Sequence, residues 1–339
     1  MDHFSWPDVL EQLLSGDGLT RAVAHDAMAE IMAGAASDAQ VGAFLVALRA
    51  KGETADEMTG FVDAMAEAAV TVDVGVPVAD SVGTGGDRSD TFNISTTAAL
   101  IAAGAGVRIA KHGNRSASSQ TGSADLLEAL GIDLEMEPAR TAEMIRTVGF
   151  GFLYAPLYHP AMRHAGPVRR SLGLRTVFNF LGPLTNPAGA QWMSVGTSDP
   201  EMATLMIEVL SNRGADTAFV FYGKDGLDEL TTSGPSVIHR LRDGEISIAE
   251  FTPQDFGVPR VKLEDLRGGD VAANVAITNA ILDGETGPKR DIALVNAAPV
   301  IVSAGLADGF TEGIELAAAA VDSGDARVVL DRAVEFSKS

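Results

Sequence analysis

The sequence predicts an α/β protein in which a small all-helical domain is joined to a larger α/β domain with a mostly parallel central sheet flanked by helices. Two observations support this prediction. Residues 1–70 show only helical periodicity, and from Val72 onward strand-like apolar runs alternate with glycine-containing loops and helices. The length of 339 residues allows two unequal domains with separate cores, which we place at residues 1–72 and 73–339.

The first domain carries two signals for the start of a helix. Ser37-x-x-Gln40 and Thr54-x-x-Glu57 have the spacing of a capping box, in which each end of the motif satisfies a backbone N–H at the helix start. Apolar residues then return at helical spacing in both segments: Val41, Phe44, Leu45, Leu48, Met58, Phe61, Val62 and Met65. We interpret this Met and Phe stripe as core or helix–helix interface.

The second domain repeats a strand–loop–helix unit. Apolar runs at residues 78–82 and 107–113 predict strands, each followed by a polar loop and a helix. Further strands are expected at QWMSVGTS and TAFVFYG, with the helix PEMATLMIEVLSNRG between them. Residues 237–257 indicate a hairpin that turns at Asp243-Gly244, and residues 270–336 are mostly helical. In such a domain the loops at the strand ends gather the ligand.

Composition excludes several classes of partner. With 25 Lys and Arg against 46 Asp and Glu, the net charge is −21, which repels nucleic acid and anionic membranes. An anionic ligand must therefore be held by a local cationic pocket or a metal ion. There is no Cys for a disulfide or a thiolate site. No apolar run is long enough to span a membrane and the N-terminus lacks signal-peptide features, so we expect a cytoplasmic protein.

The stretch DSVGTGGDRSDTFNIS, residues 80–95, predicts an anion-binding loop. It carries a strand into residues 83–86, of which three are glycines, and then into a helix start, and bare backbone N–H groups there bind anions. Arg88 replaces the third glycine of a dinucleotide fingerprint, and no P-loop is present. Side-chain donors accompany the glycines: Thr84, Ser89, Thr91, Asn93, Ser95 and Thr96. A purely structural glycine turn remains an alternative.

Two acids in this loop, Asp87 and Asp90, argue against a bare phosphate as the ligand. A carboxylate beside a phosphate is repulsive unless it binds sugar hydroxyls or amines, or unless a cation lies between them. The loop therefore favours a phosphorylated sugar.

Two further strand ends carry polar clusters. KHGNRSASSQTGSAD, residues 111–125, supplies cations, amides and hydroxyls that suit a polyphosphate or a sugar phosphate. DGLDE follows the strand TAFVFYG, and its adjacent Asp228 and Glu229 suit Mg²⁺, which takes few carboxylates and shares substrate phosphates and water. An exposed acid pair is the alternative for this second cluster.

The segment 154–187 supplies the remaining polar side chains. His159 and His164 are spaced poorly for a shared metal ion, so a structural role is the alternative for either histidine. Arg169, Arg170 and Arg175 add cations to a helical region that is broken by Gly182-Pro183.

Together these motifs resemble the anthranilate phosphoribosyltransferase family. Six elements match in order: GTGGD (83–87), FNIST (92–96), KHGNR (111–115), GSAD (122–125), VRRSLGLRTVFNFLGPLTNP (168–187) and DGLDE (225–229). The resemblance implies an enzyme that transfers the 5-phosphoribosyl group of phosphoribosyl pyrophosphate (PRPP) to the amine of anthranilate, with Mg²⁺, as the second step of tryptophan biosynthesis. It also implies a homodimer formed through the helical domain, which helices around residues 165–190 complete.

The resemblance implies a role for each matching residue. PRPP binding falls to Gly83, Thr84, Gly85, Gly86, Asp87, Thr91, Asn93, Ser95, Thr96, Lys111 and Ser123. Anthranilate binding falls to Gly83, His112, Asn114, His159, Arg169 and Gly182, with Arg169 as the partner of the carboxylate. Two Mg²⁺ ions are bound with the help of Ser95, Asp228 and Glu229. Lys111, Asp228 and Glu229 are the candidate catalytic residues.

Two other functions on a similar scaffold remain alternatives. Pyrimidine nucleoside phosphorylases place Lys-His directly before a Ser-Thr-Gly-Gly loop, whereas Ser81-Val82 precede the glycines here. A non-catalytic relative that binds nucleic acid should have a basic groove and should have lost the metal acids, whereas this chain has a charge of −21 and keeps Asp228 and Glu229.

Overall fold

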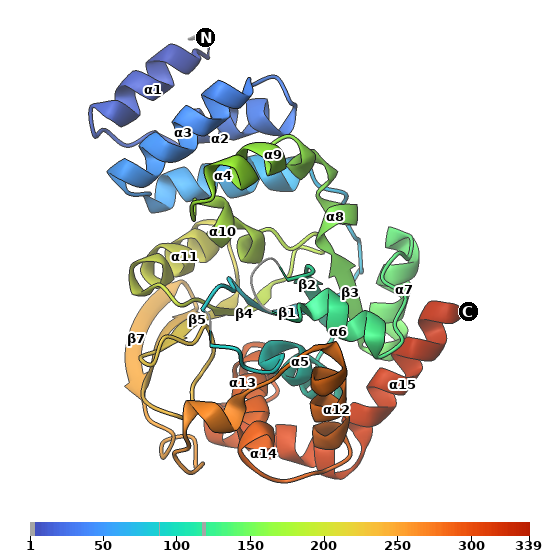
Figure 1. Ribbon diagram of the computed structural model, residues 1–339. Coiled ribbons are helices and arrows are strands. Elements are labelled where there is room, and N and C mark those ends of the chain that lie inside the picture. The colour runs from blue at the N-terminus through green and yellow to red at the C-terminus, as the bar shows by residue number, and fades with distance from the viewer. Residues whose placement is uncertain (1–3, 88, 117–119) are drawn as a thin grey trace.

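The computed structural model describes residues 4–87, 89–116 and 120–339, and it has two lobes (Figure 1). Helices alone form the smaller lobe at the top of the figure, and a sheet with its flanking helices forms the larger lobe below. Arg88 and residues 117–119 of the second polar cluster lie outside the described residues. In the part of the chain that the structure describes, no helix is both long and apolar enough to cross a bilayer.

The smaller lobe contains α1 (Trp6–Leu14), α2 (Arg21–Met32), α3 (Asp38–Lys51) and α4 (Ala55–Glu67). Both predicted capping boxes are confirmed, since Ser37 and Gln40 cap α3 and Thr54 and Glu57 cap α4. All eight residues of the predicted apolar stripe are buried in one core. After α8 (Ala155–Tyr158), whose Tyr158 is buried in a separate cluster, the chain returns to this core through short helices: η1 (Pro160–Arg163), α9 (Gly166–Leu172), α10 (Phe178–Leu181) and η2 (Gly182–Leu184).

The larger lobe is built on a seven-stranded sheet with the order β3-β2-β1-β4-β5-β6-β7. The strands are β1 (Ala79–Gly83), β2 (Ile109–Gly113), β3 (Phe150–Tyr154), β4 (Trp192–Gly196), β5 (Thr217–Gly223), β6 (Ser236–Arg242) and β7 (Glu245–Phe251). The first five are parallel, and the predicted hairpin β6–β7 adds two antiparallel strands at one edge. Asp243 and Gly244 turn the hairpin with φ of 54° and 77°, the backbone that a tight two-residue turn requires.

Helices cover both faces of the sheet (Figure 1). The remaining elements are α5 (Ile94–Gly104), α6 (Ser123–Ala129), α7 (Pro138–Val148), α11 (Pro200–Asn212), η3 (Leu263–Leu266), α12 (Val271–Leu282), α13 (Pro288–Ser303), α14 (Phe310–Asp322) and α15 (Asp325–Lys338). This arrangement confirms the predicted fold class. Alternate residues of β5 divide between two cores: Phe219 and Phe221 pack with α5 and α13, while Ala218 and Val220 pack with α11 and the smaller lobe.

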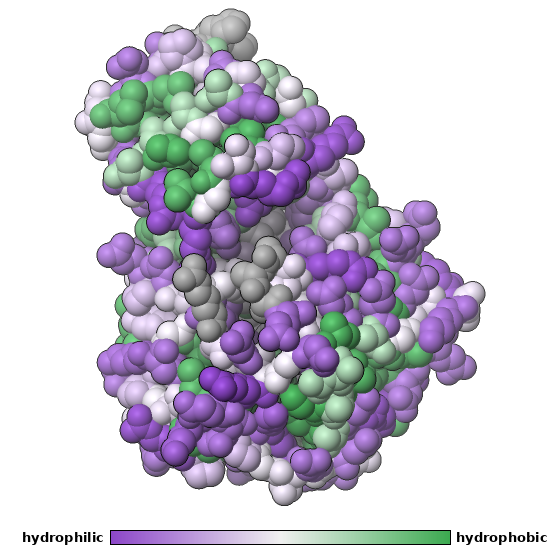
Figure 2. Space-filling model, viewed as in Figure 1, coloured by the Kyte–Doolittle hydropathy of each residue, from purple (hydrophilic) through white to green (hydrophobic). Residues whose placement is uncertain are grey.

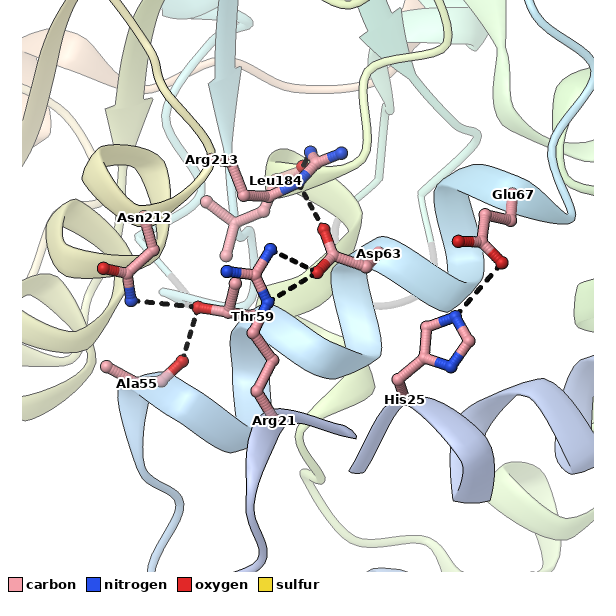
Figure 3. Close-up of polar contacts among 9 residues, drawn as sticks. All are labelled: Arg21, His25, Ala55, Thr59, Asp63, Glu67, Leu184, Asn212 and Arg213. Atoms are coloured by element: carbon pink, nitrogen blue, oxygen red, sulfur yellow. Dashed lines mark hydrogen bonds and ion pairs between the residues drawn. The ribbon is translucent and has the colours of Figure 1, made fainter. Parts of the chain in front are cut away.

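The smaller lobe is tied to the larger lobe at the end of α11 (Figure 3). Asp63 of α4 accepts hydrogen bonds at 2.6 and 2.8 Å from Arg21 and at 3.1 Å from Nε of Arg213, which follows α11. Beside this cluster, Asn212 Nδ2 donates to the hydroxyl of Thr59 at 3.2 Å. The core of the smaller lobe continues without a break onto α11 and the upper face of the sheet. The lobes are therefore joined by both packing and polar contacts.

The crossing of α2 and α4 depends on Gly60. A Cβ at this position would lie 2.3 Å from the backbone oxygen of Arg21 and 2.9 Å from the backbone nitrogen of His25. We predict that Gly60→Ala lowers the free energy of unfolding by about 1–3 kcal/mol, because neither backbone atom can yield without moving α2.

Gly42→Ala on α3 is the matched control. Its new Cβ meets only a side-chain carbon of Val168 at 3.7 Å, and replacing a helical glycine by alanine stabilises a helix by about 0.5–1 kcal/mol. Urea unfolding of both variants measures the difference. Equal stabilities for the two variants would contradict the close crossing of the helices.

Candidate active site

The predicted ligand loops meet at the C-terminal ends of the parallel strands. Gly83 ends β1 directly beside Gly196, which ends β4. Asp228 lies against both residues, since a Cβ on Gly83 would come within 2.6 Å of Asp228 Oδ2 and a Cβ on Gly196 within 1.7 Å of the Asp228 backbone oxygen. The backbone N–H of Gly85 donates to Asp228 Oδ2 at 2.7 Å. The strand ends must be glycine because the acid loop lies against them.

The acid loop after β5 is anchored by apolar side chains on either side of its two acids. Leu227 and Leu230 are fully buried in the core beneath the sheet. Between them, Asp228 and Glu229 are each only 9% exposed, and Asp228 faces the strand ends. The backbone N–H of Ser95, in the first turn of α5, donates to Glu229 Oε1 at 3.1 Å. The glycine loop, the start of α5 and the acid loop therefore form one site.

Burial disfavours the ionised forms of Asp228 and Glu229. It raises the pKa of Asp228 to about 7, with Asp87 adding to the effect, and it raises the pKa of Glu229, with Asp228 adding to the effect. A bound cation would favour the ionised carboxylates and so offset the effect of burial on their pKa values. Within residues 4–87, 89–116 and 120–339, no three His, Cys, Asp or Glu side chains gather as a metal cage. The donor set thus fits Mg²⁺ that takes its remaining ligands from substrate oxygens and water.

Asp87 lies close to this acid pair. Its carboxylate accepts a hydrogen bond from the hydroxyl of Ser89 at 2.5 Å, and that hydroxyl lies 3.2 Å from the hydroxyl of Thr91. These contacts fold the loop so that Asp87 contributes negative charge near Asp228. The loop therefore presents carboxylates as well as N–H donors, as expected for a sugar phosphate held with a cation.

A buried lysine and a buried aspartate lie beneath the glycine loop. Lys111 Nζ donates to the backbone oxygen of Ser81, and the nearby carboxylate of Asp80 partly offsets the lowering of the Lys111 pKa by burial. Asp80 accepts hydrogen bonds from the backbone N–H of His112 at 3.1 Å and from Asn186 Nδ2 at 2.7 Å. Sequence reasoning missed Asp80 and Asn186. A carboxylate inside a short strand that is predicted to be buried was the available signal for Asp80.

Three predicted PRPP-binding side chains carry polar atoms that lack partners. Thr84 Oγ1, Asn93 Oδ1 and Thr96 Oγ1 are buried, and none has a hydrogen bond within the described chain. Asn93 itself is held in place, because its backbone N–H donates to Asn274 and its Nδ2 donates to the backbone oxygen of Thr121. A buried polar atom left unpaired costs about 1–3 kcal/mol. Three such atoms at one site indicate that a polar ligand completes it.

Two buried histidines form the other side of the site. His112 Nδ1 lies 3.2 Å from the backbone oxygen of Gly182, His159 Nε2 lies 3.1 Å from that of Thr185, and the ring centroids are 5.0 Å apart. Burial and the neighbouring His159 lower the pKa of His112 to about 3, and burial lowers that of His159. Both rings are therefore neutral. Because a carbonyl only accepts, the contacting nitrogens carry the protons.

This assignment leaves the opposite nitrogens as hydrogen-bond acceptors. His112 Nε2 is buried and has no partner among the described residues. The structure thus places two predicted anthranilate contacts and Gly182 together, with an acceptor nitrogen free for a ligand.

Other predicted residues lie farther from these contacts. Asn114 is exposed, and its backbone oxygen accepts a hydrogen bond from the Ser123 hydroxyl at 3.2 Å. The guanidinium of Arg169 lies over the ring of Phe178, 5.2 Å from its centroid. Among the residues that the structure describes, no hydrogen bond joins Asn114 or Arg169 to the histidine pair.

The chain is similar to known proteins over almost its whole length. Family models described as the helical bundle domain and the a/b domain of a glycosyl transferase family match residues 7–69 and 75–327. Anthranilate phosphoribosyltransferase of Symbiobacterium thermophilum is 50% identical over 330 residues, which cover 97% of each chain. The chain belongs to the anthranilate phosphoribosyltransferase family. The resemblance drawn from the six motifs is confirmed, and with it the expectation of a phosphoribosyltransferase enzyme.

Solved structures of the family have the same fold. The crystal structure of anthranilate phosphoribosyltransferase from Thermus thermophilus has a TM-score of 0.93 and 43% identity, covering 98% of this chain and 100% of that chain. The Saccharomyces cerevisiae enzyme in complex with PRPP and Mg has a TM-score of 0.90 and 28% identity, covering 98% of each chain. Full-length relatives of this kind favour the transferase over the phosphorylase and nucleic-acid-binding alternatives.

The neutral state of His112 predicts a pH dependence of stability. The unfolded chain takes up a proton near the ordinary pKa of 6.5, whereas the folded protein takes it up only near pH 3, so stability is lost as pH falls below 6.5. At pH 5.5 this residue accounts for a loss of about 1.4 kcal/mol relative to pH 7.5.

His112→Asn removes the titrating group and keeps an amide that can donate to Gly182. We predict that its stability falls by about 1.4 kcal/mol less than that of the wild type over the same pH interval, measured by urea unfolding. His159 titrates in both proteins, so its contribution to the pH dependence is the same in each and does not affect the difference. An equal loss in both proteins would show that His112 is not held neutral.

Proposed function

We propose that this chain transfers the 5-phosphoribosyl group of PRPP to the amine of anthranilate, with Mg²⁺, as the second step of tryptophan biosynthesis. One observation carries the proposal. Glycine strand ends, the start of α5 and a buried acid pair meet in one site, beside two neutral histidines with acceptor nitrogens. The names of the full-length relatives, and the PRPP and Mg bound to the yeast enzyme, support the same reaction.

PRPP would be held by the glycine loop and the start of α5. The backbone N–H groups of Thr84 and Gly85 are paired with the Gly196 oxygen and with Asp228, so side-chain oxygens without partners supply further contacts. The hydroxyls of Thr84 and Thr96 can donate to the phosphates of PRPP, and Asn93 Oδ1 can accept from its hydroxyls. Lys111 would contribute its amino group, which donates to the backbone oxygen of Ser81 in β1. The same proposal includes the remaining residues of the predicted set: Asp87, Thr91, Ser95 and Ser123.

Mg²⁺ would be held by Asp228, Glu229 and Ser95, and we propose two ions. When bound, the metal neutralises charge that develops on the leaving pyrophosphate. The chain's own contribution is to fix the ligands in advance. Gly85 N–H holds one oxygen of Asp228, Ser95 N–H holds one oxygen of Glu229, and the low polarity of the site strengthens their attraction for a cation.

Anthranilate would enter from the histidine side of the site. Arg169 would pair with its carboxylate, and His112, His159, Asn114 and the backbone at Gly182 would line its path. The aromatic amine is neutral at pH 7, so no strong base is needed before attack. Its nitrogen lone pair forms a bond to the anomeric carbon, the bond from that carbon to the pyrophosphate oxygen breaks, and the electron pair leaves with pyrophosphate. The amine then loses one proton.

The acceptor nitrogen of His112 can orient the amine of anthranilate. Nε2 is buried and neutral and can accept a hydrogen bond from an N–H of the amine, which orients the nitrogen lone pair. Catalysis then rests on positioning and on stabilising the leaving group by Lys111, backbone N–H groups and the Mg²⁺ that Asp228 and Glu229 would hold.

The proposal includes a homodimer formed through residues 1–72 and helices around 165–190, and a cytoplasmic location. Figure 2 shows apolar surface gathered on the smaller lobe, where the side chains of Leu14 and Val46 are 72% and 44% exposed. Exposed apolar patches of this kind occur at protein interfaces. A second copy of the same lobe would cover them.

The fluorescence of anthranilate tests the proposed function. The purified protein is mixed with anthranilate, with PRPP and Mg²⁺ added separately and together. We expect fluorescence to fall only when both are present. Unchanged fluorescence with a folded protein would contradict the proposal and point to another amine as the acceptor.

The acids and the histidines should differ in their effect on turnover. We predict that Asp228→Asn lowers turnover by about 10²–10³, the usual effect of removing one preorganised electrostatic group, and that His159→Ala lowers it less. Steady-state rates at several Mg²⁺ concentrations measure both effects. An Asp228→Asn enzyme with the wild-type rate and Mg²⁺ dependence would show that this acid does not bind the metal.

A further inference from the structure

Helix α13 carries a single amide in an apolar setting. Every residue from Ile292 to Ser303 is buried, and Asn296 lies among them with 2% of its surface exposed. A buried amide is tolerated only when its polar atoms are paired. An apolar side chain would suit this environment better, so the partners of Asn296 explain its presence.

Asn296 forms hydrogen bonds with the backbone of Leu230, the residue that follows the acid pair. Its Oδ1 accepts from the backbone N–H of Leu230 at 2.9 Å, and its Nδ2 donates to the backbone oxygen of Leu230 at 2.9 Å. The second Nδ2 proton goes to the backbone oxygen of Ile292, also at 2.9 Å. Both donors and the acceptor are therefore used, and two of the three bonds hold one residue of the acid loop.

That residue is the one next to Glu229. Leu230 lies outside the strands, so its N–H and C=O have no neighbour in the sheet ladder. The side chain of Leu230 fixes the depth of the loop in the core, but apolar contacts do not set the direction of the two peptide groups that flank this residue. The two hydrogen bonds from Asn296 fix the N–H that follows Glu229 and the C=O that precedes Thr231, and they thereby fix the backbone from which the Glu229 side chain projects.

Helix α12 offers a parallel case on the other ligand loop. Asn274, also 2% exposed, accepts from the backbone N–H of Asn93 at 3.2 Å and donates to Thr121 Oγ1 and to the backbone oxygen of Gly269. Two neighbouring helices beneath the sheet thus each insert one amide, and each amide fixes a different loop of the site.

We propose that Asn296 is a positioning residue that sets the geometry of Asp228 and Glu229 for cation binding by fixing the Leu230 peptide. This inference rests on the proposed function of the acid pair. Partners that orient metal ligands typically change metal affinity by 10–100-fold when they are removed.

The test compares two variants on the same helix. Asn296→Leu keeps a similar volume and removes all three hydrogen bonds. Val300→Ala, one turn further along α13, removes a fully buried side chain and leaves the contacts of Asn296 in place. Both should lower thermal stability. Asn296→Ala, which leaves room for water, replaces the leucine variant if that variant does not fold.

Two readouts need no turnover. Backbone amide exchange at Leu230 in the ligand-free protein should rise at least tenfold in Asn296→Leu and stay unchanged in Val300→Ala. Mn²⁺ binding in the presence of pyrophosphate, followed by electron paramagnetic resonance, should weaken by about tenfold or more in Asn296→Leu and by less than about twofold in Val300→Ala. Wild-type Mn²⁺ affinity in Asn296→Leu, or equal weakening in both variants, would overturn the inference.

The outcome separates this inference from the proposed function. A wild-type protein that binds Mn²⁺ with pyrophosphate but does not consume anthranilate contradicts only the reaction. A wild-type protein that consumes anthranilate, together with an Asn296→Leu variant of unchanged Mn²⁺ affinity, contradicts only the role of Asn296.

Discussion

The close approach of Asp228 to two strand-end glycines is the constraint on which the site depends. The backbone oxygen of Asp228 occupies the space of a Cβ on Gly196, and its carboxylate occupies the space of a Cβ on Gly83. Because β1 and β4 are adjacent and in register, both glycines fall at one point of the sheet edge. The acid loop therefore lies directly over the strand ends, where the N–H groups of the glycine loop and of α5 also point.

This arrangement explains how a chain with a net charge of −21 can bind an anionic ligand. The overall field repels phosphate, so affinity must come from the site itself. The structure supplies Lys111, backbone N–H groups and polar atoms without partners, and it keeps His112 and His159 neutral. The buried acids lie against these donors, and a cation between acids and phosphate would turn repulsion into attraction.

Much of the fold and part of the site could be predicted from the sequence because their signals are local. Capping boxes, the hairpin turn, GTGGD and DGLDE each lie within a few consecutive residues, and each strand–loop–helix unit lies within about thirty. Asp80, Asn186 and Asn296 were missed because their roles depend on partners far along the chain. Asn296, for example, meets Leu230 across 66 positions, and only packing of α13 beneath the sheet brings them together.

The most direct test of the account is the effect of a single methyl group on ligand binding. Gly196→Ala places its Cβ 1.7 Å from the backbone oxygen of Asp228, while Gly234→Ala, shortly after the acid loop, has no atom within 4 Å of its Cβ. Calorimetric titration with PRPP and Mg²⁺ compares the two variants with the wild type. The account predicts wild-type affinity for Gly234→Ala and loss of binding for a folded Gly196→Ala. Wild-type affinity in Gly196→Ala would contradict it.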